Sequence, residues 1–344
     1  MTTSMPIVNQ ILPIWDWPNH DEYNCSKMHT PGEWWTQEHG RQQPVFGWWS
    51  IVWGVVCENV LQILYFPITI ALYEESKRVS CYKIMLWLAV IDIIAILSNS
   101  IFFGILLIKG YVFCSDPWFV WLVGCIGLGM WCGASANCLL LVTNRLFELL
   151  NYAHFSSRRT TQYLLLTSVY MFYFTFLTPP IFTNSKEQGM FFDPFIGPAN
   201  LEKFVNWPHT ANNLLVVMAT AVLYFSLCIV LILKQGGDGH HKRVKQNKAI
   251  FIQATLICVF NVVASLEYVY MNFFPATPTL VEIGHISWQL SHGAPPYIYL
   301  ILNKTVQDRT RKLLGIRRRR VNTTITATQT ITSSHPPTAS TFVM

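Results

Sequence analysis

Charged side chains are scarce in this sequence of 344 residues, where Asp, Glu, Lys and Arg together make up only 12%. An average soluble domain is about 25% charged, so the composition excludes an ordinary water-soluble enzyme. Apolar residues reach 52% and the mean hydropathy is +0.33, which is too much apolar surface for one core to hide from water. The net charge of +6 does not indicate nucleic-acid binding, because the basic residues lie between long apolar runs. We therefore expect a membrane protein.

Strand-like alternation of apolar and polar residues is also absent, and the apolar runs are too long for barrel strands. A helix that crosses a hydrocarbon layer about 30 Å thick needs about 20 apolar residues. Because only helices satisfy every backbone polar group inside such a run, the predicted fold class is an all-α membrane protein with a seven-transmembrane-helix bundle. The seven predicted spans are 47–73, 84–108, 118–142, 162–182, 213–233, 249–273 and 283–302.

The distribution of Lys and Arg predicts the orientation of the bundle. Of the 24 basic residues, 19 fall on the segments that are cytoplasmic if the N-terminus is outside, and five fall on the other side. Cytoplasmic loops carry the basic excess, so the N-terminus is predicted outside and the C-terminus in the cytosol. Residues 1–46 are then an extracellular segment without a signal peptide, 303–320 a basic cytoplasmic helix, and 321–344 a disordered Ser/Thr-rich tail.

Few of the nine cysteines can face an oxidising medium. Cys81 falls in the first inner loop, and Cys25 and Cys114 alone fall outside. These two form a disulfide or remain free thiols, and we favour the bridge. Asn24 starts the one outer glycosylation sequence, Asn-Cys-Ser. The remaining six lie within predicted spans: Cys57, Cys125, Cys132, Cys138, Cys228 and Cys258.

No lysine precedes Lys304 in the seventh run, which excludes a retinal Schiff base and hence a light-driven protein. His285 and His292 lie on one helical face, and with Asp92 and Glu267 they support an alternative, a membrane enzyme or transporter that uses metal or proton chemistry. Two imidazoles are fewer than the three ligands of a catalytic zinc site, so interhelical hydrogen bonding is the preferred interpretation. We predict no enzyme activity, no cofactor and no resident metal, apart from a sodium ion considered below.

Three carboxylates fall at bilayer depth, where each costs about 2.5 to 3.5 kcal/mol. Glu58, Asp92 and Glu267 must therefore face the bundle interior. Together with His292, Glu58 and Asp92 are predicted to form an intramembrane polar core.

Glu267 lies near the outer edge of the sixth run and is the first candidate for a ligand contact. His285 and Gln289 of the seventh run lie at a similar depth, and Trp118 and Trp121 of the third run supply aromatic walls. These five residues predict a small-ligand pocket in the outer half of the bundle. The alternative is that Glu267 is a solvated rim residue and the tryptophans are interfacial anchors.

Three short motifs resemble those of rhodopsin-like G-protein-coupled receptors. Leu-Ala-Val-Ile-Asp ending at Asp92 is similar to the second-helix motif whose Asp holds sodium in that superfamily. Pro296 and Tyr299, followed by Asn303, resemble the seventh-helix Asn-Pro-x-x-Tyr and its run into a cytoplasmic helix. Arg145, with Asn144 before it, ends the third run where the superfamily has Asp/Glu-Arg-Tyr.

The resemblance is closer to the nematode serpentine receptor class T chemoreceptors, and it extends over about residues 23–312. It implies a chemosensory receptor that binds a small environmental ligand, an odorant or soluble chemical, and activates a heterotrimeric G protein. The matching pieces are Tyr23 to Ser26, Ser80 to Met85, Phe113-Cys114 with Pro117, Trp131-Cys132, Asn144-Arg145, Phe192 to Pro194, His209 with Asn212-Asn213, Phe251 to Gln253, and His292-Gly293 leading to Tyr299 and Asn303.

The resemblance also implies roles at the inner face. Arg145 reaches the α-subunit of the G protein and Tyr299 stabilises the open form, with Asn144 and Asn303 beside them. An amide at Asn144, where the superfamily has an acid, predicts a weaker resting lock on Arg145. Asp92 is expected to hold either a sodium ion or a structural hydrogen bond. The sixth run has neither the usual Pro nor the usual Trp, so its hinge stays unassigned.

Further partners follow from the basic inner segments and the tail. A phosphorylated tail is expected to bind arrestin. The basic residues are either lipid-binding or topology anchors, and the family resemblance places the protein in the cell membrane, with the sensory-neuron cilium as a specific site. The basic residues concerned are Lys242, Arg243, Lys245 and Arg317 to Arg320.

Overall fold

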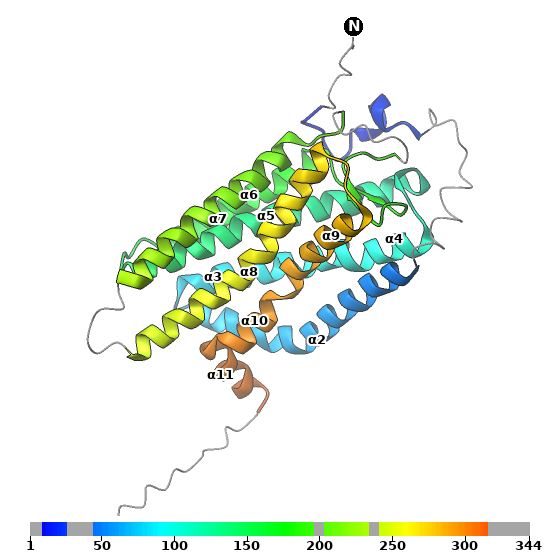
Figure 1. Ribbon diagram of the computed structural model, residues 1–344. Helices are drawn as coiled ribbons and strands as arrows, with labels where there is room; N and C mark the ends of the chain where they lie inside the picture. The colour runs from blue at the N-terminus through cyan, green and yellow to red at the C-terminus, as the bar shows by residue number, and fades with distance from the viewer. Residues whose placement is uncertain (1–8, 26–43, 196–202, 234–240, 316–344) are drawn as a thin grey trace, which may run out of the picture.

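The computed structural model describes residues 9–25, 44–195, 203–233 and 241–315, which form a bundle of long helices (Figure 1). Glu58 lies in a helix, but its side chain is outside the described part. Arg317 to Arg320 and the tail 321–344 are also outside it. The helices are α2 (Pro44–Ser76), α3 (Ser80–Ile96), α4 (Phe103–Lys109), α5 (Pro117–Leu149), α6 (Ser157–Phe176), α7 (Trp207–Leu233), α8 (His241–Phe273), α9 (Pro278–Gly293), α10 (Pro295–Leu302) and α11 (Lys304–Leu313).

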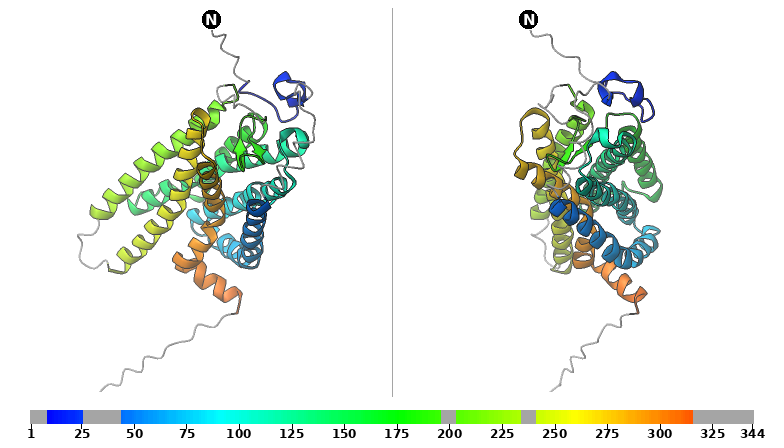
Figure 2. Two further views of the ribbon diagram at one scale, coloured as in Figure 1. Left: turned by 45° about the vertical axis from the view of Figure 1, so that its right-hand side comes forward. Right: turned by 90° about the vertical axis from the view of Figure 1, so that its right-hand side faces the viewer.

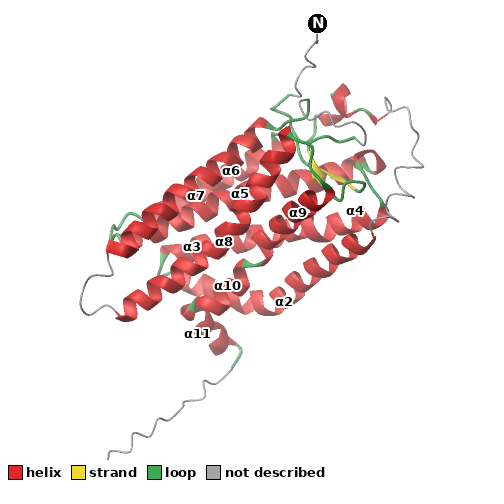
Figure 3. Cartoon of the chain, viewed as in Figure 1, coloured by secondary structure: helices red, strands yellow, loops and turns green. Residues whose placement is uncertain are grey.

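The two ends of the bundle differ in structure (Figure 2). One end, here called the hairpin end, carries residues 9–25 and a two-stranded antiparallel sheet of β1 (Phe182–Asn184) and β2 (Gly189–Phe191), drawn yellow in Figure 3. The opposite end, here called the α11 end, carries the short helix α11.

Helix α5 is the centre of the bundle and contacts α3, α6, α7 and α8. It begins where Pro117 occupies the first turn, and the Asp116 carboxylate accepts a hydrogen bond from the backbone N–H of Phe119 at 3.2 Å. Small residues then allow α6 to approach closely. A Cβ at Gly129 would collide with Thr175 of α6.

Helices α3 and α4 are joined by a π-helical segment, η5 (Leu97–Phe102), so the pair runs as one element. A π-segment breaks the regular i to i−4 bonding and leaves backbone groups available to side chains. Its three polar residues, Ser98, Asn99 and Ser100, are buried inside the bundle.

Residues 9–25 lie across the hairpin end and are held by the main chain. The backbone N–H groups of Leu12 and Ile14 donate to the carbonyls of Leu177 and Phe176 at 3.0 and 2.9 Å. Trp17 then stacks on Trp121 of α5 with ring centroids 5.1 Å apart. We call this segment, 9–25, the strap.

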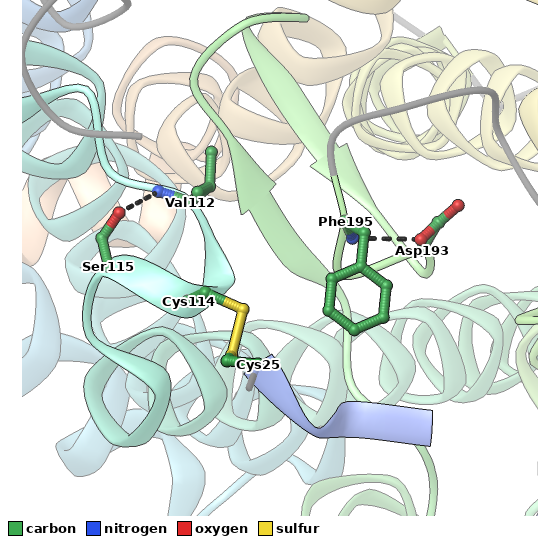
Figure 4. The surroundings of a disulfide bond; sticks show 6 residues. All are labelled: Cys25, Val112, Cys114, Ser115, Asp193 and Phe195. Atoms are coloured by element: carbon green, nitrogen blue, oxygen red, sulfur yellow. Dashed lines mark hydrogen bonds between the residues drawn. A yellow bond between two sulfur atoms is a disulfide. The ribbon is translucent and has the colours of Figure 1, made fainter. Parts of the chain in front are cut away.

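A disulfide between Cys25 and Cys114 anchors the end of the strap, which confirms the predicted bridge (Figure 4). Cys114 lies in a short turn, Phe113–Ser115, that precedes α5. Tyr23, two residues before the bridge, is buried against Phe113 and Trp121, and this burial raises the pKa of its phenol well above the usual range. The strap is therefore fixed to the bundle both covalently and by packing.

Helix α11 folds back against the end of α2. Arg309 Nε donates to Glu75 at 2.7 Å, and its guanidinium also lies 3.7 Å from Glu74. Asn303 caps α11 by accepting from the backbone N–H of Val306 at 3.2 Å. The chain turns between α10 and α11 at this cap.

Three helical elements in the described part are long and apolar enough to cross a membrane by length and composition. They are Ser80–Lys109, Pro117–Leu149 and Trp207–Leu233. Helix α7 has the most exposed apolar face of the three, with Leu215, Met218 and Phe225 among its exposed residues.

Candidate functional site

Arg145 lies near the α11 end of α5 with only 9% of its side chain exposed. Its Nη1 atom donates to Glu148 Oε2 at 2.8 Å, one turn further along α5. Asn144, the neighbour of Arg145, instead donates to Ser80 Oγ of α3 at 3.2 Å. From Asn144 alone, the sequence predicts a weak resting contact of Arg145. The structure instead pairs Arg145 with Glu148, three residues further on, where two residues of a helix are neighbours. Glu148 is thus a charged partner that sequence reasoning missed.

Tyr299 and Asn303 lie close to the same end. Tyr299 is buried, and within the described part its hydroxyl has no hydrogen-bond partner. Asn303 accepts from the Tyr82 hydroxyl of α3 at 3.4 Å while it caps α11. Asn303 therefore joins the first turn of α3 to the start of α11. The Tyr299 hydroxyl, by contrast, makes no hydrogen bond within the described part in this conformation.

A chain of three buried side chains connects α9 to α3. The Trp288 indole Nε1 donates to His292 Nε2 at 3.2 Å, and His292 Nδ1 lies 2.8 Å from Asp92 Oδ1. An indole N–H is only a donor, so His292 Nε2 must accept and its Nδ1 carries the hydrogen that Asp92 accepts. The imidazole in this arrangement is neutral. Asp92 Oδ2 is buried without a partner among the described residues.

A sodium ion does not fit this arrangement. Hard cations are held by several oxygen ligands, whereas the Asp92 carboxylate accepts a hydrogen bond from the N–H of His292. The structural hydrogen bond is therefore the interpretation of Asp92 that the geometry supports.

His285 and Gln289 meet at the π-segment of α3. His285 Nε2 and Gln289 Nε2 lie 2.9 and 3.0 Å from the backbone carbonyl oxygen of Asn99. The π-segment thus binds α3 to α9, and this pair of predicted ligand contacts makes interhelical hydrogen bonds in the structure.

Glu267 is buried between α8 and α9 with 6% of its surface exposed. Both carboxylate oxygens lack a hydrogen-bond partner in the described part of the chain. The absence of a side chain at Gly284 makes room for this carboxylate, because a Cβ there would collide with it. Glu267 and Gly284 are therefore matched across the helix pair.

The two predicted aromatic walls occupy different environments. Trp118 is 59% exposed and touches Trp17 at the edge of the strap. Trp121 is buried beneath Trp17 and beside Phe182 of the hairpin. Both residues support the strap, and neither lines the main cavity described next.

A cavity of about 190 Å³ opens at the hairpin end. Its walls come from the hairpin, from the segment that follows it and from the ends of α8 and α9. The sequence patterns did not predict it, because the hairpin fold decides which loop residues face α8. The lining is Asn184, Glu187, Met190, Phe191, Phe192, Asp193, Phe195, Phe204, Val205, Tyr268, Met271, Asn272, Phe274, Pro275, Ala276 and Val281.

A much smaller void, of about 10 Å³, lies deeper in the bundle. Tyr268 lines both this void and the main cavity. Trp288, the first member of the chain to Asp92, lines it as well. The void therefore lies between the cavity and the polar core. Its lining is Leu128, Trp131, Ile181, His209, Tyr268 and Trp288.

The metal chemistry of the alternative interpretation finds no support in this geometry. Among the described residues, no three His, Cys, Asp or Glu side chains lie together as a metal site requires. His292 is bonded to Asp92, whereas His285 is bonded to the π-segment and Glu267 faces Gly284. The four residues of that interpretation therefore lie in three separate places, with Asp92 and His292 together and His285 and Glu267 each elsewhere.

The fold is similar to that of a rhodopsin. The crystal structure of squid rhodopsin superposes with a TM-score of 0.54, covering 86% of this chain and 87% of that one at 12% identity. This likeness concerns the fold.

The family is shown by the sequence profile described as "Serpentine type 7TM GPCR chemoreceptor Srt", which matches residues 13–323. The chain belongs to this family of membrane receptors. A similar curated protein is serpentine receptor class T-55 of Caenorhabditis elegans, 24% identical over 307 residues, which are 88% of this chain and 82% of that protein. This assignment agrees with the resemblance seen in the sequence motifs, and the family is one of receptors rather than of enzymes.

Proposed function

We propose that the chain is a chemosensory receptor that binds a small environmental ligand at the hairpin end and activates a heterotrimeric G protein at the α11 end. The observation that carries this proposal is the buried Arg145 at the end of the bundle opposite the cavity. A guanidinium held by the partly exposed carboxylate of Glu148 can exchange that partner for an acidic or carbonyl group of an incoming protein.

The orientation of the bundle is part of this proposal. The basic excess predicts an N-terminus outside, and the strap and the cavity would then face the external medium. The seven predicted spans and the N-outside, C-inside topology are part of the same proposal. Helix α11 then lies at the cytoplasmic face, where Arg309 fixes it to α2.

Ligand binding is a signal only if it favours one of two packings of the bundle. Trp288 provides the link, because it lines the small void and also holds His292 against Asp92. Displacement of the Trp288 ring would release His292 and loosen the contact between α9 and α3. The sixth-helix hinge that the sequence left unassigned is thus replaced, in this proposal, by a residue of α9.

The test uses the full chain purified in lipid nanodiscs with heterotrimeric G proteins of each α-subunit class. Nucleotide exchange is followed with a non-hydrolysable GTP analogue. We expect basal exchange on at least one class and its loss in Arg145→Ala. The matched control is Arg159→Ala, because Arg159 is exposed and donates to the His154 carbonyl. Unchanged exchange in a folded Arg145→Ala protein would contradict the proposal.

The proposal has three further parts, which concern the tail, a glycan and the location in the cell. The tail 321–344, which is outside the described residues, binds arrestin once it is phosphorylated. Asn24, at the end of the strap, carries an N-linked glycan. The receptor is located in the membrane of sensory cilia.

A further inference from the structure

His209 of α7 presents a buried N–H group that has no partner in the described part of the chain. The residue is 3% exposed, and its Nδ1 atom makes no hydrogen bond. Leaving a buried donor unsatisfied costs stability, because the group has lost its hydrogen bonds to water and gained none in the protein. Such a group is a candidate for ligand recognition if the nitrogen is protonated, and so a donor, and if it lies beside open space.

The hydrogen position on His209 follows from its neighbours. The indole Nε1 of Trp131, which is only a donor, donates to Asn213 Oδ1 at 2.9 Å and so fixes the orientation of that amide. Asn213 Nδ2 then lies 3.3 Å from His209 Nε2 and donates to it. Because Nε2 accepts, the hydrogen of the neutral ring is on Nδ1. The unpartnered atom is therefore a donor.

The void beside His209 has room for about one oxygen atom. Its volume of about 10 Å³ is at the lower limit for a water molecule. The two indole N–H groups in the lining already donate to Asn213 and His292, so the polar groups left in the lining are His209 Nδ1–H and the Tyr268 hydroxyl. One acceptor oxygen therefore suits this void, and an apolar body attached to it would extend toward the main cavity.

The void adjoins the main cavity through two aromatic residues. Tyr268 lines both spaces, and the Phe192 ring of the main cavity lies 5.0 Å from the His209 ring. A ligand that occupies both spaces requires one of these two side chains to rotate. The main cavity is mostly aromatic and apolar, and its carboxylates have neighbours, since Asp193 accepts from the Phe195 N–H and Glu187 lies 4.0 Å from Lys186.

We propose that His209 Nδ1–H is the hydrogen-bond donor of the ligand site, and that the ligand is a small, largely apolar molecule with one acceptor oxygen, such as a ketone. This inference rests on the proposed function, because it takes the hairpin end as the place where the ligand binds. The apolar body lies in the main cavity and the oxygen reaches His209.

The experiment compares ketones with hydrocarbons of the same shape. The probes are acetophenone with α-methylstyrene, cyclohexanone with methylenecyclohexane, and 2-heptanone with 2-methyl-1-heptene. Binding to the full chain in nanodiscs is followed by tryptophan fluorescence, since Trp131 and Trp288 line the void. At least one ketone is expected to bind about tenfold more tightly than its hydrocarbon, which is the value of one hydrogen bond in a buried site.

Variants then assign this preference to His209. His209→Phe is expected to bind both members of the pair equally and to keep the hydrocarbon affinity of wild type within about threefold. His209→Gln retains an N–H donor and is expected to restore part of the preference. The control is His20→Phe, because His20 lies in the strap and bonds to Asp16.

Three outcomes of the ketone experiments would overturn the inference. They are equal binding of ketone and hydrocarbon in every pair, the absence of saturable binding by all three ketones, and an unchanged ketone preference in His209→Phe. A tighter affinity for 1-phenylethylamine than for acetophenone would also reject it in favour of a cationic ligand. Basal nucleotide exchange is measured on the same samples, so a receptor that activates a G protein without ketone preference rejects this inference alone.

Discussion

Removal of the His292 imidazole should destabilise the protein and make it sensitive to sodium. Asp92 and His292 are both almost completely buried, and the N–H of His292 donates to the Asp92 carboxylate. In His292→Ala, Asp92 Oδ1 loses the N–H of His292. Because Oδ2 already has no partner in the described chain, neither oxygen then has one. Leaving a buried charge without its partner costs about 3 to 5 kcal/mol.

The magnitude translates into a measurable shift of the melting temperature. A loss of 1 kcal/mol lowers Tm by roughly 2 to 4 °C in domains of 150 to 250 residues, so we expect His292→Ala to melt roughly 6 to 20 °C below wild type. The vacated space beside Asp92 admits a small cation. Sodium should then restore part of the loss, because a ligand that binds only the folded state stabilises it.

The assay is thermal unfolding in nanodiscs in NaCl, compared with choline chloride at equal ionic strength. Wild type should melt at the same temperature in both salts, whereas His292→Ala should melt higher in NaCl. The control is the double variant Asp92→Asn with His292→Ala. It has no carboxylate at this place, so it should melt at the same temperature in both salts. A wild-type protein stabilised by several degrees in NaCl, or a His292→Ala protein as stable as wild type, would refute the reasoning.

Three other predictions follow from single contacts. Replacing Cys25 or Cys114 by Ser removes a cross-link between residues 89 apart and should cost about 4 to 5 kcal/mol by chain entropy, measured as the melting temperature under non-reducing conditions; equal stability of wild type and variant would contradict it. Glu148→Gln frees Arg145 from a half-exposed ion pair worth about 0.5 to 1 kcal/mol and should raise basal nucleotide exchange roughly two- to fivefold, so an unchanged or lower rate would count against the lock. Gly129→Val places a side chain against Thr175 and should cost about 1 to 3 kcal/mol, and a variant that melts with wild type would show that α5 and α6 can separate without loss.

The general character of the molecule could be predicted from its sequence. Low charge and long apolar runs indicate a helical membrane protein, and the pieces Ser80 to Met85 and Asn144-Arg145 resemble those of the family to which the chain belongs. The cysteine pairing could also be predicted, because sorting cysteines by side leaves Cys25 and Cys114 together.

The details of the site could not be predicted in the same way. The rotation of α9 decides that His285 and Gln289 face the Asn99 carbonyl, and the π-segment that exposes this carbonyl has no sequence signature. The cavity depends on how the hairpin folds over α8 and α9, which is a tertiary property. Glu148 could be predicted as a partner of Arg145 from its spacing, because residues three apart on a helix are neighbours.

The central claim is that the cavity faces the external medium and Arg145 faces the cytosol. It is tested most directly by epitope tags at Met1 and Met344, probed with antibodies on intact and on permeabilised cells. The account predicts that the Met1 tag is stained on intact cells and the Met344 tag only after permeabilisation. Staining of both tags on intact cells, or of the Met344 tag alone, would contradict it.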